Sequence, residues 1–320
     1  VFFIINSSNA LLSFNIQRYG PRGYNRLDSA ISDGLVISMR LKSLSNGLHS
    51  PYWILFAKVN HISVYGKTID ARGAGYWSCK KKGGQCPQGA FVSKPDFNLF
   101  FSLAILSISF SWCDNVLLSG LTSLNSHNIH VTVHHSSNVG IQNIRIRASS
   151  ESPNTDGIVV QSSSRVTISW PIIKTGDDCS ALDQGSTNIW IERVVCGPGH
   201  GIRIKAWARP SGGFVRDVEF RSLIMRNVGN PLIIDQNYCP GRKGCPNQNS
   251  GVKISGVTFA NIKGTSTTPI AMKLDCSDSN HCTGIRLQNI NLTYMRGPSD
   301  SHCTNAHGRA SGVMVPRNCM

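Results

Sequence analysis

Short runs of alternating apolar and polar residues recur along the chain, and this period of two predicts β-strands with one buried side. The runs are NHISVYG from Asn60, DNVLLSG from Asp114, SNVGIQNIRI from Ser137, SRVTISW from Ser164, TNIWIER from Thr187, RDVEFRSL from Arg216, GVKISGVTF from Gly251 and TGIRLQNINL from Thr283. The second residues of the middle runs fall at positions 115, 138, 165 and 188, so the repeat length is nearly constant. Such repeat lengths are typical of stacked coils that bury their inner sides against one another.

The repeat predicts an all-β fold, a right-handed parallel β-helix. A β-sandwich normally lacks so regular a period, and a leucine-rich repeat would show an LxxLxL phrase and a helix in each unit. No Pro- or Gly-rich hinge divides the 320 residues. We therefore expect a single β-helix domain over residues 51–320, preceded by a degenerate segment over residues 1–50.

Eleven cysteines indicate disulfides and an oxidising compartment. Close spacing favours five local pairs, although sequence alone leaves the connectivity open. They are Cys79 with Cys86, Cys179 with Cys196, Cys239 with Cys245, Cys276 with Cys282, and Cys303 with Cys319. Cys113 remains as a buried free thiol. Zinc is the competing interpretation, but no CxxC pair recurs at the spacing of a structural zinc site.

The formal net charge of +15 favours a polyanionic partner. Nucleic acid, an anionic membrane and an acidic polysaccharide all fit, as does a basic protein with no such target. The chain shows no basic helix, RNP-like pattern or zinc finger, which makes nucleic acid the weakest of the three. We expect an acidic polysaccharide as partner, no membrane association and a monomer.

The start of the chain, Val1 to Ile5, has no initiating Met, basic segment or cleavage site, so a signal peptide is missing or incomplete. The apolar run from Phe97 to Phe110 is too short to span a bilayer comfortably. Two glycosylation sequons, at Asn6 and Asn291, agree with secretion.

Three polar clusters interrupt the apolar rhythm, and their spacing predicts one site. They are NTDG over residues 154–157, GDDC over 176–179 and GHGI over 199–202. The step from Asp156 to Asp177 nearly equals the step from Asp178 to His200, and each is close to one coil. Residues one coil apart lie about 4.8 Å from each other. Because carboxylates held so closely cannot all ionise easily, at least one pKa should be raised.

Neighbouring residues extend the predicted site. The glycines beside His200 indicate close approach of a ligand to the backbone, whereas a structural histidine is the plainer interpretation. Arg203 and Lys205 share one side of a strand and are suited to bind a carboxylate on an anionic sugar, although a solvated strand would look the same. A Ser-His-Asp hydrolase is disfavoured because no GxSxG motif is present.

These motifs together resemble those of the plant polygalacturonases, which are pectin-cleaving members of glycoside hydrolase family 28 with a right-handed parallel β-helix. The matching stretches are SPNTDG (152–157), TGDDC (175–179), CGPGHGI (196–202), RIK (203–205), TIDARGAGYW (68–77) and NPLIIDQNYC (230–239). The resemblance covers most of residues 52–320. It implies hydrolysis of the α-1,4-galacturonan of pectin, with inversion, without a cofactor, and in the cell wall.

The resemblance also implies roles for single residues. Asp177 would be the general acid, Asp156 and Asp178 would activate the attacking water, and His200 would lie beside the acid and help set its proton. Four residues would bind the substrate: Arg203 and Lys205 through its carboxylates, Tyr238 by stacking on a sugar ring, and Asn154 from the first motif. With Asp177 as the acid, activity should fall as pH rises through a raised pKa, which gives an acidic optimum.

The sequence departs from the family in three places. About one coil is missing between GHGI and RIK, so that His200 and Arg203 should share a strand and the cations should lie about 4.8 Å nearer the aspartates. Residues 91–106 have no counterpart in the family, and residues 13–30 match it only faintly. A mis-spliced or truncated gene would produce such blocks.

Two alternative functions follow. A catalytically impaired or dead galacturonan-binding β-helix is favoured by the missing coil. A pectate-lyase-like enzyme would use calcium and an arginine base, and the GDD motif argues against it.

Overall fold

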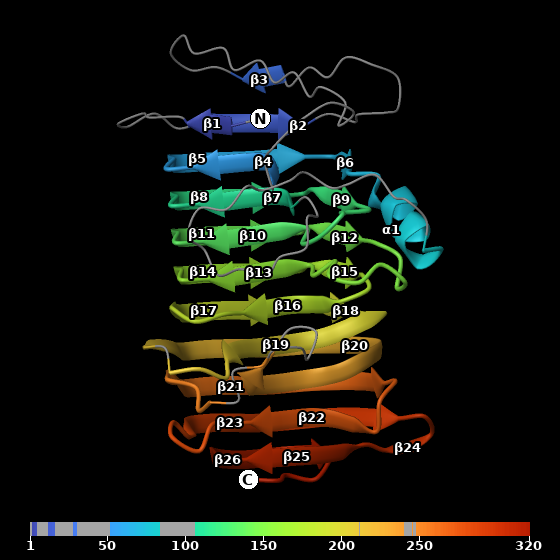
Figure 1. The fold of residues 1–320 in the computed structure, drawn as a ribbon, viewed down its shortest axis with the longest axis vertical. Helices are drawn as coiled ribbons and strands as arrows, with labels where there is room; N and C mark the ends of the chain where they lie inside the picture. The colour runs from blue at the N-terminus through green and yellow to red at the C-terminus, as the bar shows by residue number, and fades with distance from the viewer. Residues whose placement is uncertain are drawn as a thin grey trace.

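The computed structural model describes residues 52–83, 106–210, 212–239, 245 and 248–320 of the chain. It also gives the backbone of three short strands near the start: β1 (Phe2–Ile4), β2 (Leu12–Ile16) and β3 (Asp28–Ala30). The strands stack as coils in three columns along the long axis of the molecule (Figure 1). Almost all neighbouring strands pair in parallel, which confirms the predicted parallel β-helix.

The three columns follow one another around each coil. The first column contains β4 (Tyr52–Ala57), β7 (Leu106–Ser111), β10 (Val131–His134), β13 (Ile158–Gln161), β16 (Asp178–Leu182), β19 (Gly199–Trp207), β22 (Ile270–Asp275) and β25 (Asp300–Thr304). The second contains β5 (Asn60–Gly66), β8 (Asp114–Ser119), β11 (Ser137–Gln142), β14 (Ser164–Ser169), β17 (Ser186–Glu192), β20 (Gly213–Tyr238), β21 (Val252–Ser266), β23 (Cys282–Tyr294) and β26 (Ala306–Val315). The third contains β6 (Thr68–Asp70), β9 (Thr122–Leu124), β12 (Arg145–Arg147), β15 (Ile172–Lys174) and β18 (Val195–Cys196). The long strands β20 and β21 continue from the second column into the third, where β20 pairs with β18. The strand β20 then runs on into the first column, where Leu232 to Asp235 lie between β19 and β22.

The recurring sequence phrase forms the start of each strand in the second column. Asp114 pairs with Ser137, Ser137 with Ser164, and Ser164 with Thr187, so the pairing follows the repeat in the sequence. The second residue of each of these phrases has a positive φ, for example 55° at Asn115. Asparagine tolerates this left-handed conformation better than most residues. The repeat therefore encodes a backbone turn as well as a strand.

The core lies inside the coils and consists of like residues stacked in register. Val116, Val139, Val166 and Ile189 are all at most 3% exposed and lie above one another. Aromatic rings stack in the same way, with 5.1 Å between the ring centroids of Phe220 and Phe259. Each coil thus completes the apolar surface of the next.

Four of the five predicted disulfides are confirmed. They are Cys179–Cys196, Cys239–Cys245, Cys276–Cys282 and Cys303–Cys319. Cys79 is disulfide-bonded, and Cys86 lies outside the described residues. Cys113 is a buried free thiol, as predicted.

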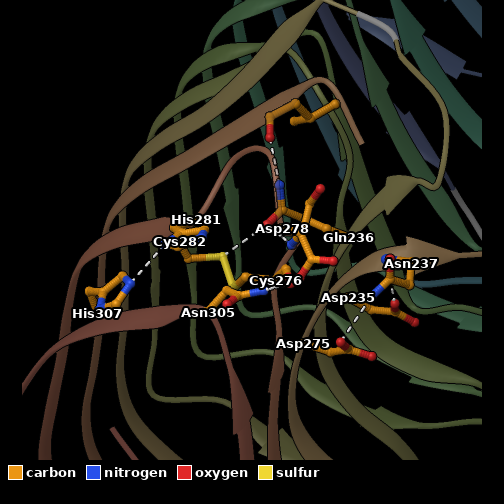
Figure 2. Close-up of a disulfide and its surroundings, with 12 residues drawn as sticks. Asp235, Gln236, Asn237, Asp275, Cys276, Asp278, His281, Cys282, Asn305 and His307 are labelled. Atoms are coloured by element: carbon orange, nitrogen blue, oxygen red, sulfur yellow. Dashed lines mark hydrogen bonds between the residues drawn. A yellow bond between two sulfur atoms is a disulfide. The ribbon is translucent and has the colours of Figure 1, made fainter. Parts of the chain in front are cut away.

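The Cys276–Cys282 disulfide lies beside a fully buried amide that ties neighbouring coils together (Figure 2). Gln236 donates a hydrogen bond to the Val252 carbonyl at 2.6 Å and accepts one from the Ser277 N–H at 3.0 Å. Because both ends of the amide have partners, Gln236 can be buried in the apolar core without an unsatisfied polar atom.

The remaining elements lie outside the three columns or at the ends of the stack. The helix α1 (Gly73–Lys81) follows β6 at the side of the third column, and β24 (Gly297–Pro298) pairs antiparallel with β23. Of the insert predicted at residues 91–106, only Leu106 lies within the described residues. Nowhere in the described part of the chain is a helix both long and apolar enough to cross a membrane.

Candidate active site

The register of the first column brings the three predicted clusters together. Ile158 pairs with Ser180, and Asp178 pairs with His200, so the one-coil step is the same in both pairs. Asp156 is consequently in register with Asp178, while Asp177 lies in the turn that precedes β16. The N–H of Gly157 donates to the carbonyl of Asp178 at 2.8 Å and fixes this alignment.

Asp177 is held by hydrogen bonds to both of its carboxylate oxygens. Oδ2 accepts from the Asn154 backbone N–H at 3.0 Å, and Oδ1 accepts from the Asp178 N–H at 2.8 Å. His200 Nδ1 is 3.1 Å from Oδ1. With an exposed fraction of 18%, the Asp177 side chain is more accessible than those of Asp156 (8%) and Asp178 (1%).

The predicted cations lie directly against these carboxylates. Lys205 Nζ is 2.8 Å from Asp178 Oδ2 and 3.1 Å from Asp156 Oδ2, and an Arg203 Nη atom is 3.4 Å from Asp178 Oδ1. The Lys205 side chain is only 13% exposed, and that of Arg203 is 16% exposed. In the resting site, the ammonium of Lys205 therefore bridges two aspartates of the same chain.

These contacts depend on the position of the cations along one strand. The single strand β19 carries His200, Arg203 and Lys205, as the sequence predicts. In this stack the next coil pairs with β19 in parallel, and the cations lie beside the aspartates.

The environments of the carboxylates move their pKa values apart. Burial raises the pKa of Asp156 to about 7, and the charges of Asp177 and Asp178 add to this effect, although Lys205 opposes it. At Asp178, burial acts in the same direction, but Lys205, His200 and Arg203 outweigh it and lower the pKa. The predicted raised pKa is therefore present at Asp156, and burial is its largest cause.

His200 is expected to carry a proton at neutral pH. Its hydrogen bonds to Asp177 and Asp178 raise its pKa to about 9, against the opposing effect of burial. The ring is 40% exposed, so it also faces the surface of the site. This places His200 beside Asp177, where the sequence predicts it.

Asp183 is a residue of the site that the sequence analysis does not identify. It follows Leu182, which pairs with Ile204, and so lies level with Lys205. Burial raises its pKa to about 6, while Lys205 lowers it. The sequence could have indicated Asp183, because the sequence separation of Asp183 and Lys205 equals that of Asp156 and Asp178.

Tyr238 lies against the same lysine. Its ring centroid is 5.4 Å from Lys205 Nζ, so this aromatic residue covers the ammonium group. Burial raises the pKa of the Tyr238 hydroxyl, although Lys205 lowers it. The sequence-predicted Tyr238 therefore belongs to the site, next to a cation.

The glycines beside His200 allow close packing of the coils, and the approach of a ligand to them stays a prediction. A Cβ at Gly201 would lie 2.0 Å from the Pro231 carbonyl oxygen of the next coil. Gly199 has a φ of +128°, which side chains rarely permit. The close approach that these glycines allow is therefore that of the neighbouring backbone.

One group of described residues could offer three ligand atoms to a metal ion: Asp177, Asp178 and His200, whose atoms lie within 4.8 Å of one another. Lys205 and Arg203 already supply positive charge to Asp178. A further cation would be repelled by them, so we assign these residues no metal.

A parallel β-helix with clustered carboxylates on its outer side is suited to cleave a polysaccharide, since glycosidic bonds are cleaved by paired acidic residues. Comparison with known proteins agrees. The family model described as glycosyl hydrolases family 28 matches residues 38–203 and 201–313. The chain belongs to this family and is a glycoside hydrolase. The match divides at residues 201–203, the place where the sequence predicts the missing coil.

Relatives of the chain include polygalacturonases of plants. A polygalacturonase of Prunus persica is 39% identical over 333 residues, which cover 94% of this chain and 80% of the relative. An exopolygalacturonase of Oenothera organensis is 34% identical, covering 83% of this chain and 80% of the relative.

Solved structures show the same fold at lower identity. An endo-xylogalacturonan hydrolase from Aspergillus tubingensis superposes with a TM-score of 0.61 at 19% identity, over 82% of this chain and 80% of that chain. A polygalacturonase from Erwinia carotovora gives a TM-score of 0.57 at 22% identity, over 81% and 73% of the two chains.

The bridging position of Lys205 leads to a stability prediction. Lys205→Met leaves the buried Asp156 and Asp178 without their main counter-ion, and should lower the free energy of unfolding by about 3–5 kcal/mol. Urea unfolding near pH 7 measures this. The double variant Lys205→Met with Asp178→Asn should recover part of the loss, since it removes the buried charge that has lost its nearest partner. Lys253→Met, at an exposed lysine, is the control, and equal unfolding midpoints for Lys205→Met and the unaltered protein would contradict the prediction.

Proposed function

We propose that this chain hydrolyses the α-1,4-galacturonosyl linkages of polygalacturonate and pectin, with inversion at the anomeric carbon. The observation that carries the proposal is the cluster of Asp156, Asp177 and Asp178 beside two cations in a family 28 chain. The relatives named polygalacturonase supply the substrate class.

Asp177 is the general acid in this proposal. It is the most exposed of the three aspartates, and it lies beside the imidazole of His200, which can help to set its proton. Its carboxyl group gives a proton to the glycosidic oxygen as the bond from that oxygen to the anomeric carbon breaks. The released sugar end then carries the new hydroxyl group.

Asp178 is the general base. Its lowered pKa keeps it ionised in acid, so it can take a proton from the attacking water while the water oxygen bonds to the anomeric carbon. Asp156 holds a proton below about pH 7, and it orients the water by hydrogen bonding. Asp178 and Asp156 therefore have different parts in activating the water, a role that the resemblance assigns to both.

The substrate is held by the surrounding polar and aromatic groups. Arg203 can contact a galacturonate carboxylate with the part of its guanidinium that Asp178 does not use, since that group has several donors. Lys205 contributes positive charge beside Asp156 and Asp178, and Tyr238, whose ring lies next to Lys205, can stack on a sugar ring. Asn154 positions Asp177 through its backbone, and its exposed side chain can bind a sugar hydroxyl.

The setting of this activity is the cell wall. Four described disulfides require an oxidising compartment, which supports secretion. The net charge of +15 favours retention on an acidic polymer.

The first test concerns the acid. Asp177→Asn should lower the release of reducing ends from polygalacturonate by about 10²–10⁴-fold, because the leaving oxygen loses its proton donor. Asp217→Asn, in the second column, is the matched control. If the unaltered protein folds and binds the polymer but releases no more reducing ends than Asp177→Asn, the chain is a galacturonan-binding protein without catalysis.

The second test separates Asp156 from Asp178 by pH. With Asp178 as base, kcat/KM should be highest in acid, and Asp156→Asn should keep at least about a tenth of the activity, whereas Asp178→Asn loses about 10²–10⁴-fold. If Asp156 were the base, it would have to be ionised, and activity would fall as pH drops through about 7. A full pH profile of each variant distinguishes the two assignments.

The third test concerns stereochemistry. Inversion predicts that the β-anomer of the new reducing end appears first and then mutarotates, because water attacks opposite the leaving group. Proton NMR during the first minutes of hydrolysis shows which anomer forms first. Initial α-anomer would instead indicate a covalent intermediate and a carboxylate nucleophile.

A further inference from the structure

The third column presents a row of basic side chains on its outer side. Arg145 and Arg147 lie on β12, and Arg147 pairs in register with Lys174 on β15. Arg226 continues the row on β20, at the position that stacks on Gly197 after β18. We call these four residues the basic face. Figure 1 shows the short strands of this column directly above one another, at the side of the molecule that carries α1.

The charges of the basic face are not neutralised by neighbours. None of the four residues forms an ion pair or a side-chain hydrogen bond within the described part of the chain. In the five short strands of the column, the one acidic residue is Asp70, whose carboxylate accepts from the Arg72 N–H and the Asn125 amide. Adjacent rungs are about 4.8 Å apart, so Arg147 and Lys174 repel each other.

An exposed aromatic ring borders the same face. Trp170 precedes β15 at the corner between the second and third columns and is 52% exposed. The guanidinium of Arg193 lies over its ring, 4.4 Å from the centroid. A single exposed ring needs no explanation by itself. A flat ring beside several cations, however, is suited to a sugar that carries a carboxylate.

The basic face lies next to the active site along the chain. Lys174 is the last residue of β15, and Asp177 follows it by three positions in the turn that leads into β16. A polymer lying on the basic face would therefore reach the aspartates at its edge. Short substrates that fill only the aspartate cluster would not extend over the column.

We propose that the basic face is a second binding surface for an acidic polysaccharide, which holds a polyuronate chain outside the catalytic cluster. The identity of the polymer rests on the proposed function. The binding itself depends on the unpaired cations of the third column, and it requires no catalysis.

The test uses the full chain with Asp177→Asn, so that the polymer stays intact. Arg145→Gln, Arg147→Gln and Lys174→Gln are combined in one variant. A matched control combines Lys253→Gln, Arg286→Gln and Arg309→Gln, which removes the same charge from exposed positions of the second column. Binding to immobilised polygalacturonate is measured at several salt concentrations, and thermal unfolding confirms that both variants are folded.

We expect the basic-face variant to bind polygalacturonate roughly tenfold more weakly at low salt, and the control variant to change little. The difference should shrink at high salt, as screening predicts. With Asp177 restored, hydrolysis of short oligogalacturonates should be unchanged while that of dilute polymer falls.

Equal losses for the two variants would overturn the proposal, because net charge alone would then explain binding. Equally tight binding of DNA or dextran sulfate to the basic face would also overturn it, since the surface would then not select a uronate polymer. If no hydrolysis is found but the difference in polygalacturonate binding persists, the proposed function fails while this inference stands.

Discussion

The register of parallel strands is the constraint on which the rest of the structure depends. Each coil repeats the backbone hydrogen bonds of the last, so a residue lies above another that is one coil earlier in the chain. Inside the coils, this places like apolar residues in contact. On the outer side of the first column, the same geometry stacks Asp156, Asp178 and His200, although they are far from adjacent in sequence. The core and the site therefore both result from the same coil repeat.

Register also determines which charged residues of the site are neighbours. The strands stay in phase across the site, with Leu182 paired to Ile204 and Ile204 to Ile234. Lys205 Nζ lies within 3.1 Å of two aspartates. At Asp178 its charge helps to lower the pKa, whereas at Asp156 it opposes the burial that raises the pKa to about 7. The electrostatics of this site thus depend on which coils are neighbours.

Much of this was predictable from the sequence, because spacing alone determines register in a solenoid. The phrase starting at Asp114 and its repeats predicted the strands, and the nearly equal spacing of the polar clusters predicted that Asp156, Asp178 and His200 converge. Two features were not predictable in this way. The reason for Gly201 depends on a backbone approach from Pro231, at a bulge that spacing does not show. The raised pKa of Asp156 depends on burial, and a sequence motif does not reveal how deeply a side chain is buried.

Two groups of cations in the described part of the chain differ in their surroundings. In the first column, Lys205 and Arg203 are partly buried and compensated by aspartates, so they add little to the field outside the molecule. In the third column, Arg147 and Lys174 are uncompensated among the described residues, and their field reaches about 8–10 Å into water at ordinary salt. An approaching polyanion would be attracted by the third column. Because Lys174 lies three positions before Asp177, that attraction would bring the polymer to the edge of the carboxylate cluster.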